Sequence, residues 1–345
     1  MENYKTFPLV SVIIVNYDGK ELLKKCLSSI KRQTYSNFEI IIVDNGSTDG
    51  SVKFIKREYS NSVKLIENSR NLGFGKGNNQ GITISKGEYV ALLNNDTEVE
   101  PSWLSELVKV AQSDKRIGMC ASKILLGDNQ TQIDVAGHLI YPDGLNRGRG
   151  HREQDVGQYD TKEEVLFPSA CAAIYSRDML DEIGLFDEDF FAYGDDTDIG
   201  IRARLMSWKC IYVPTAVVYH YRSATLGNYA PLKAYLVERN RIWVLLKYFP
   251  FSTIIVSPCF TLKRLILQAY GSIMSIGAAG KFSKEFSKMR LLLILIRAYI
   301  SAFGGLGRVL RQRREIMKRR KVSNIDFRKW LREFRIGARE LALKE

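Results

Sequence analysis

Short, mainly apolar runs alternate with segments of helical spacing through the first 113 residues of the chain. The apolar runs cover residues 10–15, 40–43, 63–66 and 89–93, and the helical spacing covers residues 21–32, 51–56, 78–85 and 101–113. The first run is rich in Val and Ile, which is typical of a strand buried on both faces. The alternation predicts an α/β fold whose mostly parallel central sheet is covered by helices on both faces.

Polar side chains follow three of these predicted strands. Asn16 and Asp44 come directly after two of them, and Asp96 lies three residues beyond a third. Ligands of such sheets bind beyond the carboxyl ends of the strands, so we expect the three side chains along one rim. Each residue alone is ordinary turn chemistry, whereas the three together favour a ligand site.

The pattern is weaker in the middle of the chain. Apolar runs at residues 117–123, 167–174, 209–214 and 216–220 predict further strands, the last of which ends at His220. Residues 127–160 are polar and rich in glycine, so loops are expected there. The other two histidines, His138 and His151, fall in this segment and are assigned no role.

A cluster of carboxylates precedes a further helical segment at residues 199–204. Asp195, Asp196 and Asp198 occupy three of four positions. An Asp at a helix start usually caps free backbone N–H groups, and Asp198 is our choice for that structural role. Three carboxylates are more than the capping of one helix needs. Together with Asp96 they suit metal-assisted transfer from a diphosphate donor to a hydroxyl, in which one acid holds the cation and another takes the proton.

The last third of the chain is dominated by longer apolar stretches. Residues 248–262 and 265–280 are free of charge and are separated by Lys263 and Arg264, and residues 291–296 form a third apolar run. None reaches the roughly 18 to 20 uninterrupted apolar residues of a spanning helix. Flanking Lys and Arg favour helices that lie in the membrane interface. An all-helical packing region or homodimer interface is the competing interpretation.

The net charge of +13 is concentrated at the C-terminal end. Residues 307–345 contain 14 Lys or Arg against 5 Asp or Glu, which is +9 of the +13. Such a segment seeks phosphates, either of nucleic acid or of an anionic membrane surface, unless it is simply a solvated helix face. Phe327, Trp330 and Phe334 lie between the charges, but no nucleic-acid module accompanies them, so no nucleic-acid partner is expected.

The cysteines and the N-terminal residues indicate in which cellular compartment the protein resides. Five cysteines are scattered singly without C-x-x-C spacing, which argues against a disulfide framework or a zinc site and suits a reducing cytoplasm. Residues 1–8 lack the charged start and apolar centre of a signal peptide. We therefore expect a cytoplasmic protein, peripherally associated with the inner face of the cell membrane.

Several linked motifs occur in one order along residues 9–222. They are VSVIIVNY at 10–17, VDNGSTDGS at 43–51, NLGF at 71–74, GNN at 77–79, LNNDT at 93–97 and DDTD at 195–198. With these motifs the chain resembles family 2 of the inverting nucleotide-sugar glycosyltransferases, which have the GT-A fold, and within it the branch of bacterial rhamnosyltransferases. The resemblance implies a GT-A catalytic domain at residues 8–222, followed by a C-terminal helical, basic and membrane-associating region at 223–345.

The resemblance also assigns the donor site. Asp44 is where the family holds the base or ribose of the nucleotide, and Asn16 and Tyr17 would line the same slot. The other nucleotide-binding residues that it implies are Asn71, Gly73, Asn94 and Asn95.

The family's D-x-D metal motif is altered in this chain. Its place is taken by residues 94–96, whose first acid is an amide, so Asp96 is the only carboxylate ligand expected there. His220 matches a histidine that completes the metal shell in some relatives. Carboxylate, imidazole and phosphate oxygens suit Mn²⁺ or Mg²⁺, and the imidazole favours Mn²⁺.

The acidic cluster receives the chemistry of the acceptor. By resemblance, Asp196 is the general base that accepts the proton of the attacking hydroxyl, and Asp195 holds the acceptor. A single displacement predicts inversion at the anomeric carbon. Lys76, in a glycine-rich loop, is a candidate phosphate contact, and at most one of Arg239 and Arg241 is expected to reach a diphosphate, the alternative being a surface helix.

The leading hypothesis is transfer of a sugar from a nucleotide-sugar donor to a glycan or lipid-linked acceptor during cell-surface polysaccharide synthesis. A sugar-phosphate nucleotidyltransferase would share the sheet and the metal carboxylate. It would not need the cluster around Asp196, however, and its N-terminal arginine and lysine signature is absent. A non-catalytic membrane-bound scaffold is the third interpretation. The donor, including the rhamnose suggested by the branch, is not fixed by the residues.

Overall fold

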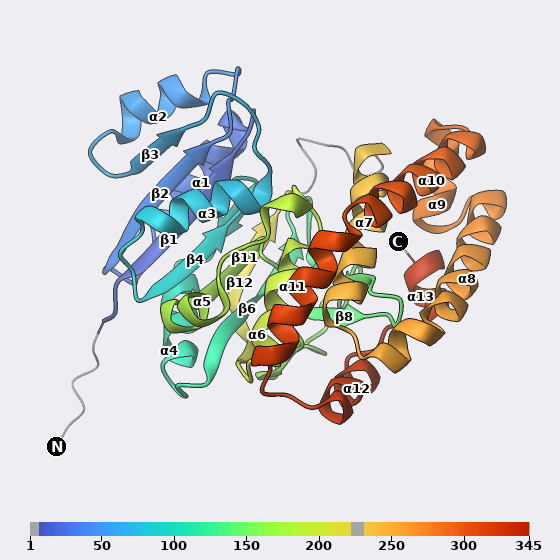
Figure 1. The fold of residues 1–345 in the computed structure, drawn as a ribbon. Helices are drawn as coiled ribbons and strands as arrows, with labels where there is room; N and C mark the ends of the chain where they lie inside the picture. The colour runs from blue at the N-terminus through green and yellow to red at the C-terminus, as the bar shows by residue number, and fades with distance from the viewer. Residues whose placement is uncertain (1–6, 222–230, 345) are drawn as a thin grey trace.

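The computed structural model describes residues 7–221 and 231–344 (Figure 1). The strands are β1 (Val10–Asn16), β2 (Phe38–Asp44), β3 (Lys64–Glu67), β4 (Tyr89–Leu93), β5 (Thr97–Val99), β6 (Ile117–Leu126), β7 (Asn129–Val135), β8 (His138–Ile140), β9 (Asn146–Gly148), β10 (Glu163–Glu164), β11 (Ala172–Ser176) and β12 (Lys209–His220). The helices of the first 221 residues are α1 (Lys20–Ile30), α2 (Ser51–Tyr59), α3 (Phe74–Ile84), α4 (Trp103–Ala111), α5 (Arg177–Ile183) and α6 (Asp195–Leu205), with a 3₁₀ turn at Glu188–Phe190. The later helices are α7 (Pro231–Tyr248), α8 (Phe251–Met274), α9 (Gly277–Glu285), α10 (Lys288–Gly304), α11 (Leu306–Arg319), α12 (Asn324–Glu333) and α13 (Ala338–Leu343).

One large sheet organises the N-terminal two thirds of the molecule. Its strand order is β10-β12-β6-β11-β4-β1-β2-β3, with β5 attached to β12 and β7 to β6. The pairs β1–β2, β1–β4, β2–β3 and β6–β12 are parallel, and β11 is antiparallel to both of its neighbours. The predicted mostly parallel sheet is confirmed. The register opposes Asn16 to Asp44, so both polar residues do end their strands at one rim.

Each face of the sheet is covered by its own hydrophobic core. Val12 and Ile14 of β1 belong to one core together with Leu23 of α1, whereas Ile13 belongs to a second core together with Ile82 of α3. Successive side chains of a strand point to opposite faces, which is why an unbroken apolar run marked a strand buried on both sides.

The expectation of loops at residues 127–160 was wrong in part. This segment contains β7, β8 and β9, which pair with β6 or with each other. The first four residues of β7 are polar, and β8 and β9 have only three residues each, so the apolar alternation from which strands are predicted is almost absent in them. The consequence for function is that His138 lies on β8 and is buried.

The C-terminal region is helical, as expected, and packs on the sheet-containing part of the molecule rather than apart from it. A third core joins Phe167 and Phe190 to Trp243, Val309 and Phe327. The two charge-free stretches are not separate helices, because α8 runs through Lys263 and Arg264. Arg264 is buried, where its guanidinium bonds Asp143 and Glu238.

No single helix within residues 7–221 and 231–344 has both the length and the apolar content needed to cross a membrane. The helices α10 and α11, which meet at a bend of 57°, reach that length and apolar content only when the two are taken together.

Candidate active site

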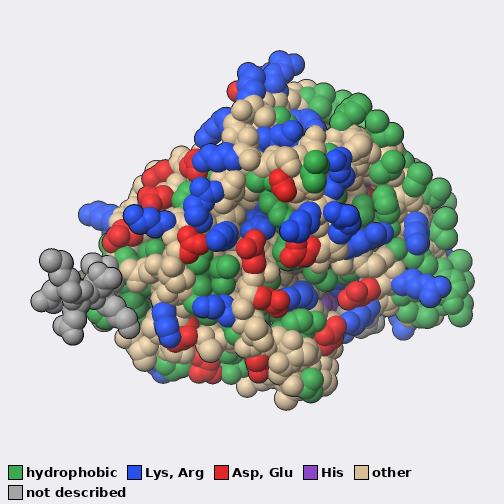
Figure 2. All heavy atoms as spheres, turned by 90° about the horizontal axis from the view of Figure 1, so that it is seen from below, with side chains coloured by type: hydrophobic (Ala, Val, Ile, Leu, Met, Phe, Trp, Pro, Cys, Tyr) green, Lys and Arg blue, Asp and Glu red, His purple; other side chains and the backbone are tan. Residues whose placement is uncertain are grey.

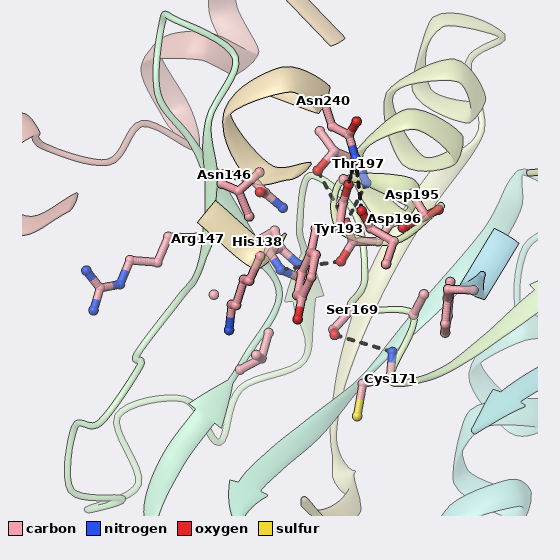
Figure 3. A pocket seen from close by; sticks show the side chains of 18 of the residues that line it. His138, Asn146, Arg147, Ser169, Cys171, Tyr193, Asp195, Asp196, Thr197 and Asn240 are labelled. Carbon is pink, nitrogen blue, oxygen red and sulfur yellow. Dashed lines mark hydrogen bonds and ion pairs between the residues drawn. The ribbon is translucent and has the colours of Figure 1, made fainter. Parts of the chain in front are cut away.

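A cavity of about 670 Å³ opens at the carboxyl ends of β1 and β4. Its walls come from segments far apart in the sequence, namely the loop after β4, the end of β12, the β8–β9 hairpin, the start of α6 and the helices α7, α8, α9 and α13. The predicted residues Asp96, Asp195, Asp196 and His220 all line it. The carboxylate after β4 and the carboxylates that open α6 therefore share one cavity. Figure 3 shows the part of the cavity around Asp196.

Asp96 and His220 form the candidate metal position. The Nε2 atom of His220 lies 3.3 Å from Oδ1 of Asp96, and that Oδ1 is buried without a hydrogen-bond partner. Two ligands of one divalent cation stand about 3 Å apart when each lies about 2.1 Å from the ion, so the pair fits such an ion. No group of three or more His, Cys, Asp or Glu within residues 7–221 and 231–344 could hold a metal ion alone. Donor phosphates or water would have to complete the shell.

His220 is oriented by Asp134, a residue that the sequence did not reveal. The Nδ1 atom of His220 lies 2.7 Å from Oδ2 of Asp134, and His151 Nδ1 lies 3.2 Å from the other oxygen, Oδ1. Burial lowers the pKa of His220, but Cys171, Asp96 and Asp134 outweigh it and raise that pKa well above its usual value. The carboxylate of Asp134 thus holds the imidazole with Nε2 turned to Asp96, as a carboxylate behind a metal-ligating histidine does.

The residues predicted for the nucleotide fall into two groups. Those that line the cavity are Tyr17, Asn71, Gly73, Asn94 and Asn95, whereas Asn16 and Asp44 are buried and do not line it. Asn16 Nδ2 donates to Asp44 Oδ1 at 2.9 Å, and Asn16 Oδ1 accepts from Asn95 Nδ2 at 2.8 Å. In this structure Asp44 is therefore connected to the cavity through the hydrogen bonds of Asn16 and Asn95.

The acidic cluster opens α6 with three different environments. Asp196 faces the cavity, and its Oδ1 accepts the backbone N–H of Thr197 at 2.8 Å. Asp195 is buried with its Oδ1 unpartnered, and this burial, with the charge of Asp196 adding to it, raises the pKa of Asp195 well above its usual value. Burial of this kind favours the protonated acid, which can donate a hydrogen bond.

Asp198 is structural, but not as the predicted helix cap. Gly194 is the N-cap of α6, with no side-chain cap bond. The carboxylate of Asp198 is buried instead, where Oδ1 accepts from Tyr248 at 2.5 Å and pairs with Lys247, and Oδ2 pairs with Arg202 at 2.9 Å. The partners Lys247 and Tyr248 come from α7, about 50 residues later, which local capping rules cannot see.

The basic candidates are mostly occupied by protein partners. Lys76 pairs with Glu188 at 3.1 Å, and Arg239 donates to the carbonyls of Asp189 and Phe190. Arg241 lines the cavity but pairs with the buried Glu238. The alternative of a surface helix is wrong here, because Asn240 and Arg241 are buried.

Asn240 is a further residue that the sequence did not single out. Its Nδ2 donates to the carbonyls of Phe190, Ala192 and Tyr193, which fixes the loop before Asp195.

Comparison with known proteins finds a family model and several named glycosyltransferases that are similar to this chain. The family described as "Glycosyl transferase family 2" matches residues 11–184. EpsH of Bacillus subtilis is 34% identical over 268 residues, which are 68% of this chain and 71% of that protein. The N-acetylglucosaminyl-diphospho-decaprenol L-rhamnosyltransferase of Mycobacterium tuberculosis is 28% identical over 251 residues, 64% of this chain and 78% of that one.

Other relatives are much longer than this chain. The match spans 25% of an uncharacterized protein of Sinorhizobium fredii and 18% of the O-antigen biosynthesis protein RfbC of Myxococcus xanthus, each at 30% identity and over 64% and 63% of this chain.

Two solved structures share the fold. A mannosyltransferase from Pyrobaculum calidifontis in complex with GDP-Man and Mn²⁺ superposes with a TM-score of 0.53 at 16% identity, covering 93% of this chain and 88% of that one. GalNAc-T7 with UDP, GalNAc and Mn²⁺ gives 0.58 at 17% identity, covering 81% and 55%. The fold is thus GT-A with a C-terminal helical region, and by the family match the chain belongs to glycosyl transferase family 2.

Proposed function

We propose that this chain transfers a sugar from a nucleoside-diphosphate sugar to a hydroxyl of a glycan acceptor, with inversion and with a divalent metal. The observation that carries the proposal is the single cavity lined by the Asp96–His220 pair and by Asp196. A cation position and a candidate base around one space are what this transfer needs.

On the donor side, Asp96 and His220 would hold Mn²⁺ or Mg²⁺, and Mn²⁺ is the better match to imidazole. When bound, the cation would neutralise charge on the departing nucleoside diphosphate. Both solved structures named above contain Mn²⁺, one with GDP-Man and the other with UDP, which supports this assignment. Asn94, Asn95 and Tyr17 offer hydrogen-bonding groups to the nucleotide from the same rim.

On the acceptor side, Asp196 would take the proton of the attacking hydroxyl while the new glycosidic bond forms and the bond to the diphosphate breaks. Asp195 would hold the acceptor, because its burial favours the protonated, hydrogen-bond-donating form. One displacement without a covalent intermediate inverts the anomeric carbon.

The acceptor that we propose is lipid-linked, with the protein bound peripherally to the inner face of the membrane. Large apolar side chains are exposed along α8 and α10, among them Ile255, Ile266, Ile273, Met289, Ile300 and Phe303. The Mycobacterium tuberculosis relative is named for an acceptor on diphospho-decaprenol, which supports a lipid-linked glycan and a rhamnose donor as the first to test.

Release of nucleoside diphosphate from a panel of nucleotide sugars, with Mn²⁺ and Mg²⁺ supplied separately, tests the proposal. Asp196→Asn should lower transfer by about 10²- to 10⁴-fold while the nucleotide still binds. Asp96→Asn should weaken metal-dependent binding of the donor. Asp160→Asn is the control, because Asp160 does not line the cavity, its side chain is exposed, and its buried partner Lys123 keeps a second carboxylate, Asp155.

The outcomes separate the alternatives. Full turnover in both cavity variants would rule out the assignment. Formation of a nucleotide sugar from a sugar phosphate and a nucleoside triphosphate would identify a nucleotidyltransferase, and binding without any turnover would favour a scaffold.

A further inference from the structure

All three histidines of the chain line this same cavity, although the sequence analysis assigned a role only to His220. His138 contacts the acidic cluster at Asp196. It begins β8, its ring stacks on Phe167 with centroids 5.0 Å apart and planes 17° apart, and its backbone N–H donates to the carbonyl of Phe167 at 3.2 Å. The imidazole is therefore held in one orientation before any ligand arrives.

That orientation points the ring at Asp196. The Nε2 atom of His138 lies 3.7 Å from Oδ2 of Asp196, and Figure 3 shows this contact as a dashed line inside the cavity. The other oxygen of Asp196 accepts the N–H of Thr197. The two oxygens thus face two different groups, and together these groups define the plane of the carboxylate. A separation of 3.7 Å closes to a hydrogen bond through a small rotation, as catalytic contacts often do when substrate binds.

The charge of His138 suits this contact. Burial lowers the pKa of His138 more than the neighbouring Asp196 and Asp134 raise it, so the ring is neutral at neutral pH. A neutral imidazole offers one N–H to a carboxylate without adding a positive charge beside it. Asp196 would be oriented in this way and would keep its capacity to accept a proton.

We propose that His138 is a positioning residue for Asp196: its Nε2–H holds Oδ2 and thereby fixes the direction from which the carboxylate meets the acceptor hydroxyl. This inference rests on the proposed function, because it takes Asp196 as the base. A buried histidine that only fills space beside Phe167 would give the same stacking, so the experiment has to separate the ring from its N–H.

Two variants make that separation. His138→Phe keeps a flat ring for the stack on Phe167 but removes the donor, whereas His138→Gln removes the ring but supplies an N–H. Steady-state transfer is measured for the full chain with Mn²⁺ and the donor found in the nucleotide-sugar screen, together with nucleotide binding and the melting temperature.

If His138 positions the base, His138→Phe lowers kcat for transfer by about 10- to 100-fold, which is less than the about 10²- to 10⁴-fold expected from loss of the base itself, while the KM for the donor and nucleotide affinity stay within about twofold. His138→Gln recovers several-fold of that loss. In the Asp196→Asn background, His138→Phe costs no further activity, because two residues that act through one contact are not additive.

Three results would overturn the inference: wild-type kcat in His138→Phe, a larger loss in His138→Gln than in His138→Phe, or a fall in donor affinity that matches the fall in kcat. Failure of the proposed function is a separate observation, because in that case the wild-type protein transfers no sugar from any donor and His138 has no base to position.

Discussion

At the scale of single residues, Asp134 decides how the candidate metal position is arranged. Its carboxylate lies between His220 and His151, with Oδ2 and Oδ1 within 2.7 Å and 3.2 Å of their Nδ1 atoms. Without Asp134 the ring of His220 could rotate or change tautomer, and Nε2 would no longer be directed at Asp96.

Asp134→Asn is predicted to raise the Mn²⁺ concentration needed for half-maximal transfer by about 10- to 100-fold, because an outer-shell partner fixes ligand orientation. Activity at saturating Mn²⁺ should fall less than this. Titration of activity with Mn²⁺ measures both effects, and Asp160→Asn provides a carboxylate control outside the cavity. An unchanged Mn²⁺ requirement would show that Asp134 does not orient His220 for metal.

The sequence predicted part of this site for a physical reason. Asp96, Asp196 and His220 stand at the ends or starts of regular elements, where the topology of a parallel sheet brings side chains together. Asp134 lies on β7, which begins with four polar residues, and His138 on the three-residue strand β8, whereas the roles of Asp198 and Asn240 come from partners about 50 residues away. Contacts of that kind depend on tertiary packing and leave no local pattern.

At the scale of elements, the turn before α3 is the point where the donor and acceptor sides of the cavity meet. Phe74 N–H donates to the carbonyl of Phe191 at 2.6 Å, which ties this turn to the loop before Asp195. Gly73 has a φ of +90°, and a Cβ placed on it would stand 2.5 Å from the same carbonyl oxygen. Only glycine permits this approach of the two backbones.

Gly73→Ala is therefore predicted to destabilise the fold by about 1–3 kcal/mol and to lower transfer, since the substitution adds strain at positive φ and pushes the loop of Phe191 away. Thermal unfolding and transfer assays measure the two effects. Gly304→Ala, at the end of α10 with no atom within 4 Å of the added Cβ, should leave both close to wild type. Equal behaviour of the two variants would mean that the contact with Phe191 is dispensable.

The elements themselves were predictable where burial dictates sequence. The strands β1, β2 and β4 are buried along nearly their whole length, so their apolar runs have no competing interpretation. The β8–β9 hairpin has three-residue strands, and all three residues of β9 are half-buried. The hairpin is held partly by Ile140, whose backbone forms hydrogen bonds with Phe334 and Ile336 near the C-terminus. A segment stabilised from so far along the chain cannot be found by a local pattern.

At the scale of the whole molecule, the apolar side chains left exposed are concentrated at one end. The helices α8, α9 and α10 lie together at the side opposite β2 and β3 (Figure 1), and the view from below shows apolar side chains gathered at that same side with Lys and Arg beside them (Figure 2). Ile273 and Ile300 are each 67% exposed. A patch of this kind beside basic residues suits an anionic membrane surface, and it also suits a second copy of the chain.

Binding to vesicles separates these two occupants. The double variant Ile273→Gln with Ile300→Gln keeps helix propensity and net charge, and it removes two apolar side chains that would each gain roughly 1–2 kcal/mol on insertion. We predict that the wild-type protein cosediments with vesicles containing anionic lipid, less so with neutral vesicles or at high salt, and that the double variant binds about 30- to 1,000-fold more weakly.

Val156→Gln, at an 81% exposed apolar position between β9 and β10, is the matched control and should bind vesicles like the wild type. If the wild-type protein ignores vesicles but forms a dimer in sedimentation equilibrium that the double variant abolishes, the patch is an interface between copies. Binding that responds to salt but not to the double variant would instead assign the membrane contact to the basic residues of α11 and α12, because apolar insertion is insensitive to screening whereas attraction between charges is not.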